Sequence, residues 1–181
     1  MSQTPYVESA IRQLEYEQRD APEPREWFER RAKWDRRFMA LAKLVSTWSK
    51  DPSTKIGAVI VDYDNVVMGL GYNGFPRGVD DTDERLNNRE LKYKLVTHAE
   101  VNAIINAAGD VRGCRMYVYP TLMLPNICPE CAKVAAQAGI EEVIGYHAET
   151  AERWQQYAEA SSIICEESGI TLRVLSPEEP A

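Results

Sequence analysis

The order of apolar runs along the chain constrains the fold more than any other feature. Residues 55–62 (KIGAVIVD) are almost wholly apolar and β-branched, and a second such run, 66–73, follows the turn residues Asp64 and Asn65. The two runs predict neighbouring strands. Further strands are predicted over 114–122, 141–146 and 170–175, alternating with helices over 97–109, 128–139 and 149–167. This order predicts an α/β domain with a mixed central sheet of about five strands flanked by helices.

The regions around this pattern divide the chain further. A helix is predicted from Arg25 to about Trp48, because apolar side chains recur at helical spacing at Trp34, Phe38, Leu41 and Val45. We expect a partly helical extension over 1–33, the main domain over 34–175 and a tail over 176–181. Residues 74–91 predict a long polar loop, and loops of that length in compact domains are usually functional or disordered.

Charge and hydropathy exclude several classes of protein. The chain has 21 basic and 28 acidic residues, a net charge of −7, which argues against a polynucleotide partner that needs a positive face. No apolar run approaches the roughly 18 residues that span a bilayer, so no membrane partner is expected. The first twenty residues lack the apolar centre of a secretory signal. We therefore expect a cytoplasmic enzyme or binding protein.

Two short motifs at predicted helix starts point to a metal site. His98 and Glu100 stand in H-A-E, where Thr97 is the predicted N-cap and Glu100 completes a capping box. Cys128 and Cys131 stand in C-P-E-C, and residues at i and i+3 lie on neighbouring parts of a helix surface. His98 would be a third ligand and leave the fourth tetrahedral position for water. This is the plan of a catalytic zinc site.

Glu100 is predicted to act beside the metal rather than to bind it. Residues two apart share no lateral face of a helix, but in the first turn both can project beyond its end. Glu100 could then take a proton from water and deliver it to a leaving group. The C-P-E-C pair also fits a redox site, and His98 or Glu100 alone would fit an ordinary helix terminus. Cys114 and Cys165 are predicted to be buried thiols.

The motifs together match a known family. H-x-E followed by P-C-x-x-C is the signature of zinc nucleobase deaminases. WSKDPSTKIGAVIVD, GLGYNGFPRGVDD, KYKLVTHAEVNAI, CRMYVYPTL and CAKVAAQAGIEEVI, in that order over about residues 34–175, resemble the deoxycytidylate (dCMP) deaminase family. The resemblance implies a cytidine deaminase-like three-layer α/β/α fold and hydrolytic deamination of dCMP to dUMP and ammonia. It implies that His98, Cys128 and Cys131 bind Zn²⁺ and that Glu100 shuttles protons.

The same resemblance implies a nucleotide site built from several segments. It places Asn73 against the deoxyribose and the backbone at Ala99 against the pyrimidine edge. A phosphate needs cations or N–H donors. The residues expected on the 5′-phosphate side are Lys50, Ser53, Lys55, Tyr146 and His147.

Regulation and assembly are also implied by the resemblance. Many members of the family are hexamers activated by dCTP and inhibited by dTTP, so we expect a homo-oligomer. The residues expected to contact a nucleotide triphosphate and its Mg²⁺ are Gly71, Tyr72, Gly74, Arg77, Asp80 and Asp81. The alternative for this segment is a solvated, charged turn.

The sequence departs from the family pattern near the base pocket. The family has proline directly before its first cysteine, whereas here Pro125 stands three residues before Cys128. The segment after Tyr146 is also shorter. The alternatives are therefore a zinc deaminase acting on another cytosine nucleoside or nucleotide, on a modified cytosine nucleotide, or on a base in tRNA. A non-enzymatic nucleotide-binding regulator would be expected to lack the glutamate, and Glu100 is present.

Overall fold

The computed structural model describes residues 24–121, 127–147 and 152–176. The chain divides into two compact units, Met1–Arg37 and Phe38–Ala181. Helix α2 (Pro24–Ser46) begins in the first unit and ends in the second. Most of the predicted N-terminal extension, nearly all of the tail and the loop that carries the displaced proline lie outside the described residues.

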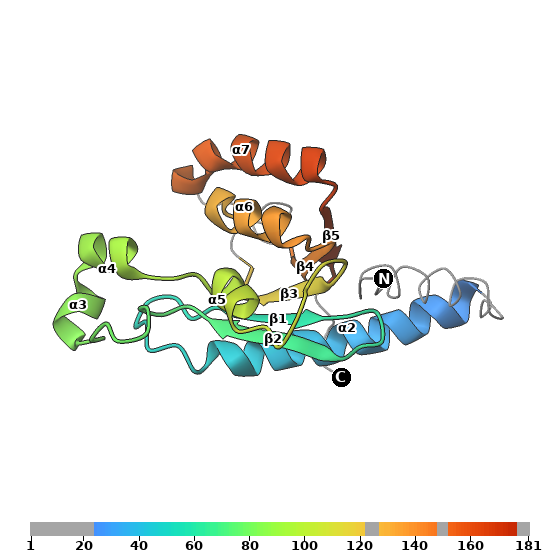
Figure 1. Cartoon of the computed structure of the whole chain (residues 1–181), viewed down its shortest axis with the longest axis horizontal. Helices are drawn as coiled ribbons and strands as arrows, with labels where there is room; N and C mark the ends of the chain where they lie inside the picture. Colours follow the sequence, from blue (N-terminus) through green and yellow to red (C-terminus); the bar gives the residue numbers. More distant parts are fainter. Residues whose placement is uncertain (1–23, 122–126, 148–151, 177–181) are drawn as a thin grey trace, which may run out of the picture. The chain divides into compact units, whose positions relative to one another are not determined.

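A five-stranded mixed sheet forms the centre of the second unit, as predicted (Figure 1). Its order is β2-β1-β3-β4-β5, with β1 antiparallel to both neighbours and β3, β4 and β5 parallel to one another. All five residues of β1 are buried, as expected for a strand covered on both faces. The strands are β1 (Gly57–Val61), β2 (Val67–Tyr72), β3 (Arg115–Tyr119), β4 (Glu142–Tyr146) and β5 (Thr171–Leu175).

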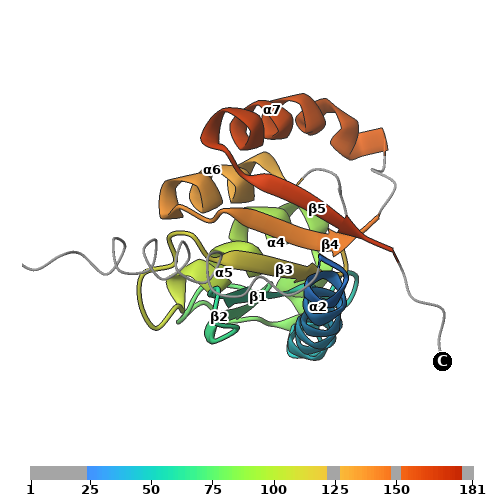
Figure 2. The same cartoon turned by 90° about the vertical axis from the view of Figure 1, so that its right-hand side faces the viewer.

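Helices cover both faces of the sheet, which makes three layers (Figure 2). One face carries α5 (Ala99–Ile105), α6 (Pro129–Ala138) and α7 (Glu152–Ser168). Residues 38–46 of α2 cover the other face. The core under α5 to α7 includes Ala58, Ile60, Met116, Val118 and Val143. Among the described residues, no helix combines the length and hydropathy needed to cross a bilayer.

The predicted long polar loop is wrong over its second half. The structure has two short helices there, α3 (Asp83–Asn87) and α4 (Arg89–Leu95), which we call the helical insert (83–95). Thr82 caps α3 by accepting a hydrogen bond from Arg85 N, and Asn88 both ends α3 and caps α4. These helices start at polar caps rather than on an apolar stripe, so hydrophobic periodicity does not reveal them.

The predicted N-terminus of the next helix is also wrong by one residue. The N-cap of α5 is His98, with φ −72° and ψ 156° and no side-chain capping hydrogen bond, so the expected capping box does not form. Thr97 instead pairs with Gly74 in an isolated β-bridge, through N···O distances of 2.8 and 3.1 Å. This pairing holds Thr97 in extended backbone and leaves the His98 imidazole at the helix end.

Candidate metal centre and its surroundings

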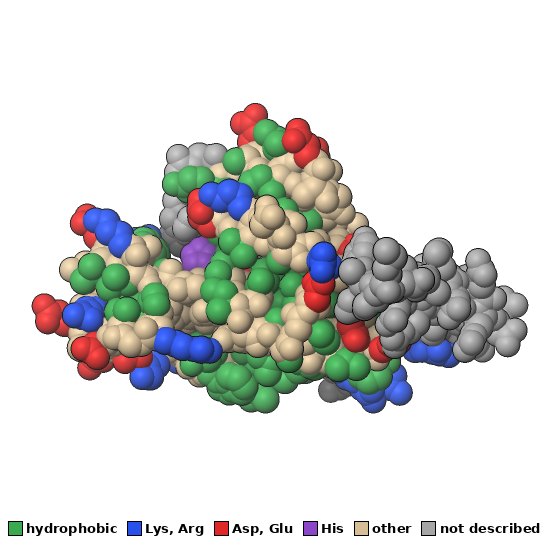
Figure 3. All heavy atoms as spheres, viewed as in Figure 1, with side chains coloured by type: hydrophobic (Ala, Val, Ile, Leu, Met, Phe, Trp, Pro, Cys, Tyr) green, Lys and Arg blue, Asp and Glu red, His purple; other side chains and the backbone are tan. Residues whose placement is uncertain are grey.

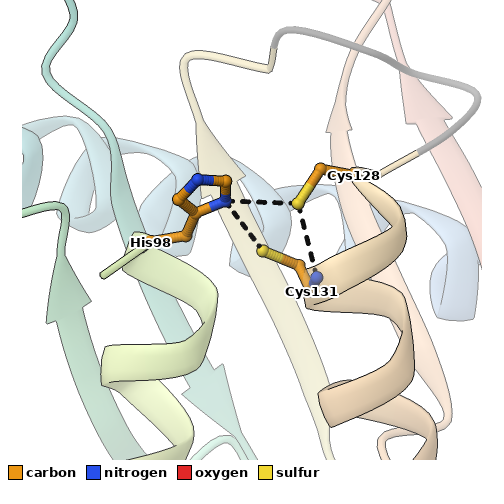
Figure 4. A group of neighbouring side chains, drawn as sticks. All are labelled: His98, Cys128 and Cys131. Atoms are coloured by element: carbon orange, nitrogen blue, oxygen red, sulfur yellow. Dashed lines mark hydrogen bonds between the residues drawn. The ribbon is translucent and has the colours of Figure 1, made fainter. Parts of the chain in front are cut away.

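Two histidine and cysteine motifs far apart in the sequence meet at one point (Figure 4). The Nδ1 atom of His98 lies 3.2 Å from the Sγ atoms of both Cys128 and Cys131. All three donor atoms lie within 4.8 Å of one another. His98 and Cys128 are half-buried and Cys131 is buried. The predicted set of three ligating side chains is therefore brought together.

The sheet register explains why the motifs meet. Gly57 at the start of β1 pairs with Tyr72 at the end of β2 and with Tyr119 at the end of β3. The segments leading from β2 to His98 and from β3 to Cys128 thus leave the sheet at the same edge.

The backbone before and after Cys128 is also held in place. Cys128 is the N-cap of α6, where its Sγ accepts a hydrogen bond from Cys131 N at 3.3 Å. The buried Ser161 of α7 donates to the carbonyl oxygen of Ile127. A helix cap and a tertiary contact therefore fix the direction of the first cysteine.

Contacts among the three donors shift their pKa values. The hydrogen bond to Cys128 raises the pKa of His98 to about 9, against the opposing effect of burial. Hydrogen bonds from Cys131 and His98 lower the pKa of Cys128 to about 5, whereas the bond to Cys128 and burial raise that of Cys131 well above its usual value. One imidazole and two thiols form a ligand set that zinc uses in sites with three protein ligands. Zinc binding releases the protons carried by the thiols and by the ligating nitrogen of the imidazole. The residues present fit a zinc ion.

Glu100 lies buried in the first turn of α5. Burial raises the pKa of this carboxyl, and the negative charge of Cys128 raises it further. Its Oε2 atom is buried and has no hydrogen-bond partner among the described residues. A buried polar atom without a partner is costly, so this oxygen is available for a proton-bearing group brought by water or substrate.

The residues predicted to contact the sugar and the base are both buried. Asn73 is buried, and its amide accepts from Ile56 N and donates to the carbonyl of Thr54. These two bonds use half of the capacity of an amide. Ala99 is fully buried and directly follows His98.

The predicted phosphate contacts are more exposed. Ser53 and Lys55 are exposed on the segment before β1, and His147 is exposed after β4. Tyr146 is half-buried, its N–H donates to Thr121 Oγ1, and its ring meets that of Tyr119 edge to face at 6.4 Å.

The predicted effector residues have intramolecular partners in this structure. Arg77 donates to Asn106 at 2.6 Å, and Asp81 pairs with Lys50 at 2.7 Å. Gly71 is buried beneath α5, and Asp80 is exposed. Three of the predicted effector residues line a pocket of about 120 Å³, namely Tyr72, Gly74 and Asp81. Trp48, Lys50 and Lys92 line the same pocket.

One buried charge pair that the sequence did not predict is part of the lining of this pocket. Lys92 of α4 and Asp51, which follows α2, form an ion pair at 2.9 Å. Lys92 falls near the predicted polar loop, where lysines are normally exposed. The D-P-S-T run that follows Lys50 is typical of a turn stabilised by side chains. This run was the one signal in the sequence that Asp51 has a structural role. Cys114 and Cys165 are buried free thiols, as predicted.

The mixed sheet, the His/Cys/Cys cluster at two helix starts and the buried glutamate define a zinc-dependent deaminase class of protein. The family model for the cytidine and deoxycytidylate deaminase zinc-binding region matches residues 32–147. The chain belongs to this family.

Known proteins similar to this chain support the same placement. It is 41% identical over 157 residues to the deoxycytidylate deaminases of Mus musculus and of Homo sapiens, covering 80% of this chain and 81% of each relative. A crystal structure of dCMP deaminase from the cyanophage S-TIM5, in complex with dCMP and dUMP, is similar with a TM-score of 0.59 and 22% identity. It covers 80% of this chain and 97% of that one, which supports the fold.

Proposed function

We propose that this protein hydrolyses dCMP to dUMP and ammonia. The observation that carries the proposal is the convergence of His98, Cys128 and Cys131 beside the buried carboxyl of Glu100. Relatives named deoxycytidylate deaminase are 41% identical to this chain over 157 aligned residues, which cover most of both lengths. The reaction consumes one water, which adds its oxygen at C4 of the pyrimidine, and releases the 4-amino group as ammonia.

His98, Cys128 and Cys131 would hold the zinc ion of the site. Bound there, zinc would supply Lewis-acid chemistry that makes water nucleophilic near neutral pH. Glu100 would take a proton from the attacking water and deliver a proton to the departing amine. A single carboxyl can fill both roles because the two transfers occur in sequence. We assign this proton transfer to its Oε2 atom, which is buried and has no hydrogen-bond partner within residues 24–121, 127–147 and 152–176.

The substrate would lie along the sheet edge next to this cluster. We assign the deoxyribose to Asn73, the pyrimidine edge to the backbone of Ala99, and the 5′-phosphate to the exposed segment around Ser53 and Lys55. The 5′-phosphate side would be closed by Tyr146 and His147. Lys50 is a further cation on the same segment, although here it pairs with Asp81.

A substrate panel tests the proposal directly. Purified, zinc-loaded protein is incubated with dCMP, CMP, deoxycytidine, 5-methyl-dCMP and a tRNA, and ammonia release is measured. The proposal expects dCMP to give the highest kcat/KM. A preference for another member of the panel would favour a related zinc deaminase. On the face shown in Figure 3, basic and acidic side chains are interspersed, which does not favour a polynucleotide substrate.

The proposed function extends to regulation. We assign a nucleotide triphosphate with Mg²⁺ to the end of β2 and the segment that follows it, in particular to Gly71, Tyr72, Gly74, Arg77, Asp80 and Asp81. A homo-oligomer of deaminase subunits is part of the same proposal. Size-exclusion chromatography with light scattering tests the assembly, and a monomer at all concentrations would contradict it.

A further inference from the structure

A buried ion pair joins the helical insert to the segment before β1. Lys92 Nζ lies 2.9 Å from Asp51 Oδ1, and the two side chains are only 6% and 9% exposed. Burying two charges is costly unless their geometry and their other hydrogen bonds repay the loss of hydration. The neighbouring Lys50 also forms an ion pair, with Asp81, but those two side chains are 69% and 41% exposed.

The pair organises the tight turn that follows Asp51. Asp51 Oδ1 also accepts hydrogen bonds from Ser53 N at 2.8 Å, Ser53 Oγ at 2.8 Å and Thr54 N at 3.1 Å. Ser53 Oγ in turn accepts from Lys92 Nζ at 2.6 Å. Lys92 thus contacts both the carboxylate and the hydroxyl that shape the turn.

Residues 49–56, which contain this turn, are tied to Asn73 by four hydrogen bonds. Ser49 Oγ donates to Asn73 O at 2.8 Å, and Asn73 N donates to Ile56 O at 3.2 Å. The amide of Asn73 accepts from Ile56 N at 2.7 Å and donates to Thr54 O at 2.8 Å. A shift of the turn must therefore move Asn73 or break these bonds.

Asn73 is in turn connected to the metal cluster. The next residue, Gly74, pairs with Thr97, and Thr97 directly precedes His98. A continuous series of hydrogen bonds and peptide links therefore runs from Lys92 to His98. Both ends of the series belong to the stretch 92–98, so the insert and the metal-binding helix are held against the same segment.

We propose that Lys92 and Asp51 are a positioning pair that sets residues 49–56 and Asn73 relative to His98. The inference rests on the proposed function, because residues 49–56 and Asn73 form the substrate-facing edge in that proposal. The pair touches no reacting atom, so its loss weakens substrate binding and leaves the chemical step and the zinc site largely intact. A substrate-binding edge that loses its position raises KM more than it lowers kcat.

Four variants test the role of the pair. Lys92→Met removes the charge at similar length, Asp51→Asn keeps the shape of the acceptor, and Lys92→Arg keeps a cation with several donors. Lys94→Met is the matched control, because Lys94 is an exposed lysine of the same helix. The measurements are zinc content, dCMP kinetics and hydrogen–deuterium exchange of residues 49–56.

We expect Lys92→Met and Asp51→Asn to retain zinc, to exchange faster over residues 49–56 and to lose roughly 10- to 100-fold in kcat/KM, mainly through KM. Lys92→Arg should recover part of this loss, and Lys94→Met should match the wild type. If Lys92→Met does not fold, the contrast between Asp51→Asn and Lys92→Arg decides the question.

Unchanged KM in Asp51→Asn and in any folded Lys92→Met would overturn the positioning role, even if exchange were faster, because the pair would then be only structural. An equal rise in KM in Lys94→Met would also overturn it, since the effect would be one of general charge. Wild-type protein that deaminates none of the cytosine nucleotides would instead contradict the proposed function, and the inference with it.

Discussion

Gly71 of β2 lies directly against the backbone of Ala103 in α5. A Cβ atom at Gly71 would lie 2.2 Å from Ala103 N and 2.2 Å from Ala99 O, closer than any side chain allows. The helix that carries His98 and Glu100 therefore rests on the sheet without an intervening side chain. The position of the metal cluster depends on this close approach.

We predict that Gly71→Ala displaces α5 and lowers stability. Overpacking of this kind costs about 1–3 kcal/mol, because backbone atoms must move to relieve the contact. Thermal unfolding and zinc content should both show the change. Gly109→Ala is the control, since its nearest neighbour would be Met68 Cε at 3.8 Å, an ordinary contact. Equal melting temperatures for the two variants would contradict the prediction.

The second prediction concerns the thiols of the cluster. Cys128→Ala and Cys131→Ala each remove one of three donors that lie within 4.8 Å of one another. We expect about one zinc per wild-type chain and a loss of zinc in both variants, because a site with two remaining protein ligands binds the ion weakly. Elemental analysis measures the occupancy. Cys165→Ala, a change at a buried thiol of α7, is the control, and full occupancy in both cluster variants would refute the ligand assignment.

The third prediction separates Glu100 from the ligands. Glu100→Gln keeps the size of the side chain but removes its ability to take up a proton. We expect zinc to be retained and deamination to fall by roughly 10²- to 10⁴-fold, the usual contribution of a general acid–base group. Single-turnover assays at saturating dCMP measure the chemical step. A variant with near-normal turnover would place the proton transfer on another residue.

The features that could be predicted from the sequence are those encoded by residues close together in the chain. The strands from Gly57 and from Val67 were predictable because β-branched runs and the Asp64–Asn65 turn encode them within a few residues. The metal cluster was predictable because two helix starts each carry their ligands in one short motif.

The features that sequence analysis missed depend on distant partners. His98 rather than Thr97 caps α5 because Gly74, 23 residues earlier, holds Thr97 in a β-bridge. The buried role of Lys92 depends on Asp51, which is 41 residues away. Polar residues are expected to be exposed unless they are paired, and both partners here are distant in the sequence. Local sequence patterns therefore predict neither the bridge between Gly74 and Thr97 nor the ion pair of Lys92.

The fourth prediction concerns acid stability and follows from Asp51. Burial alone would raise the pKa of this carboxyl, but hydrogen bonds from Ser53, Lys92 and Thr54 outweigh burial and lower the pKa from its ordinary value of 3.8. A carboxyl whose pKa is lower in the folded state than in the unfolded state stabilises the protein at pH values above its unfolded-state pKa. That stabilisation is lost as the pH falls below 3.8 through the folded pKa.

We therefore expect wild-type protein to exceed Asp51→Asn in free energy of unfolding at neutral pH, with the difference shrinking as the pH falls below 3.8. Urea unfolding of both proteins over this range measures it, and Asp64→Asn, a change at an exposed turn residue, is the control. A difference that stays constant or grows in acid would contradict the prediction.

The fifth prediction concerns the proposed effector segment after β2. Arg77 donates to Asn106, the C-cap of α5, and the side chains of Asn102 and Asn106 both donate to carbonyls of β2. A phosphate that drew Arg77 away would break a contact on the helix whose other end is capped by His98. This gives a physical route for coupling of an effector to the site, and such coupling is commonly about 1–3 kcal/mol.

We expect sigmoidal dependence of the rate on dCMP, a more hyperbolic dependence with dCTP and Mg²⁺, and inhibition by dTTP. Arg77→Ala should weaken both responses while zinc content stays at the wild-type level, because Arg77 would contact phosphate and not metal. Arg89→Ala is the matched control, since Arg89 is an exposed arginine of the insert that lies over the ring of Tyr93. Steady-state rates over a matrix of dCMP and effector concentrations measure the coupling. Hyperbolic kinetics that neither triphosphate alters would show that the segment is a solvated, charged turn, because a ligand without differential affinity for two states shifts neither of them.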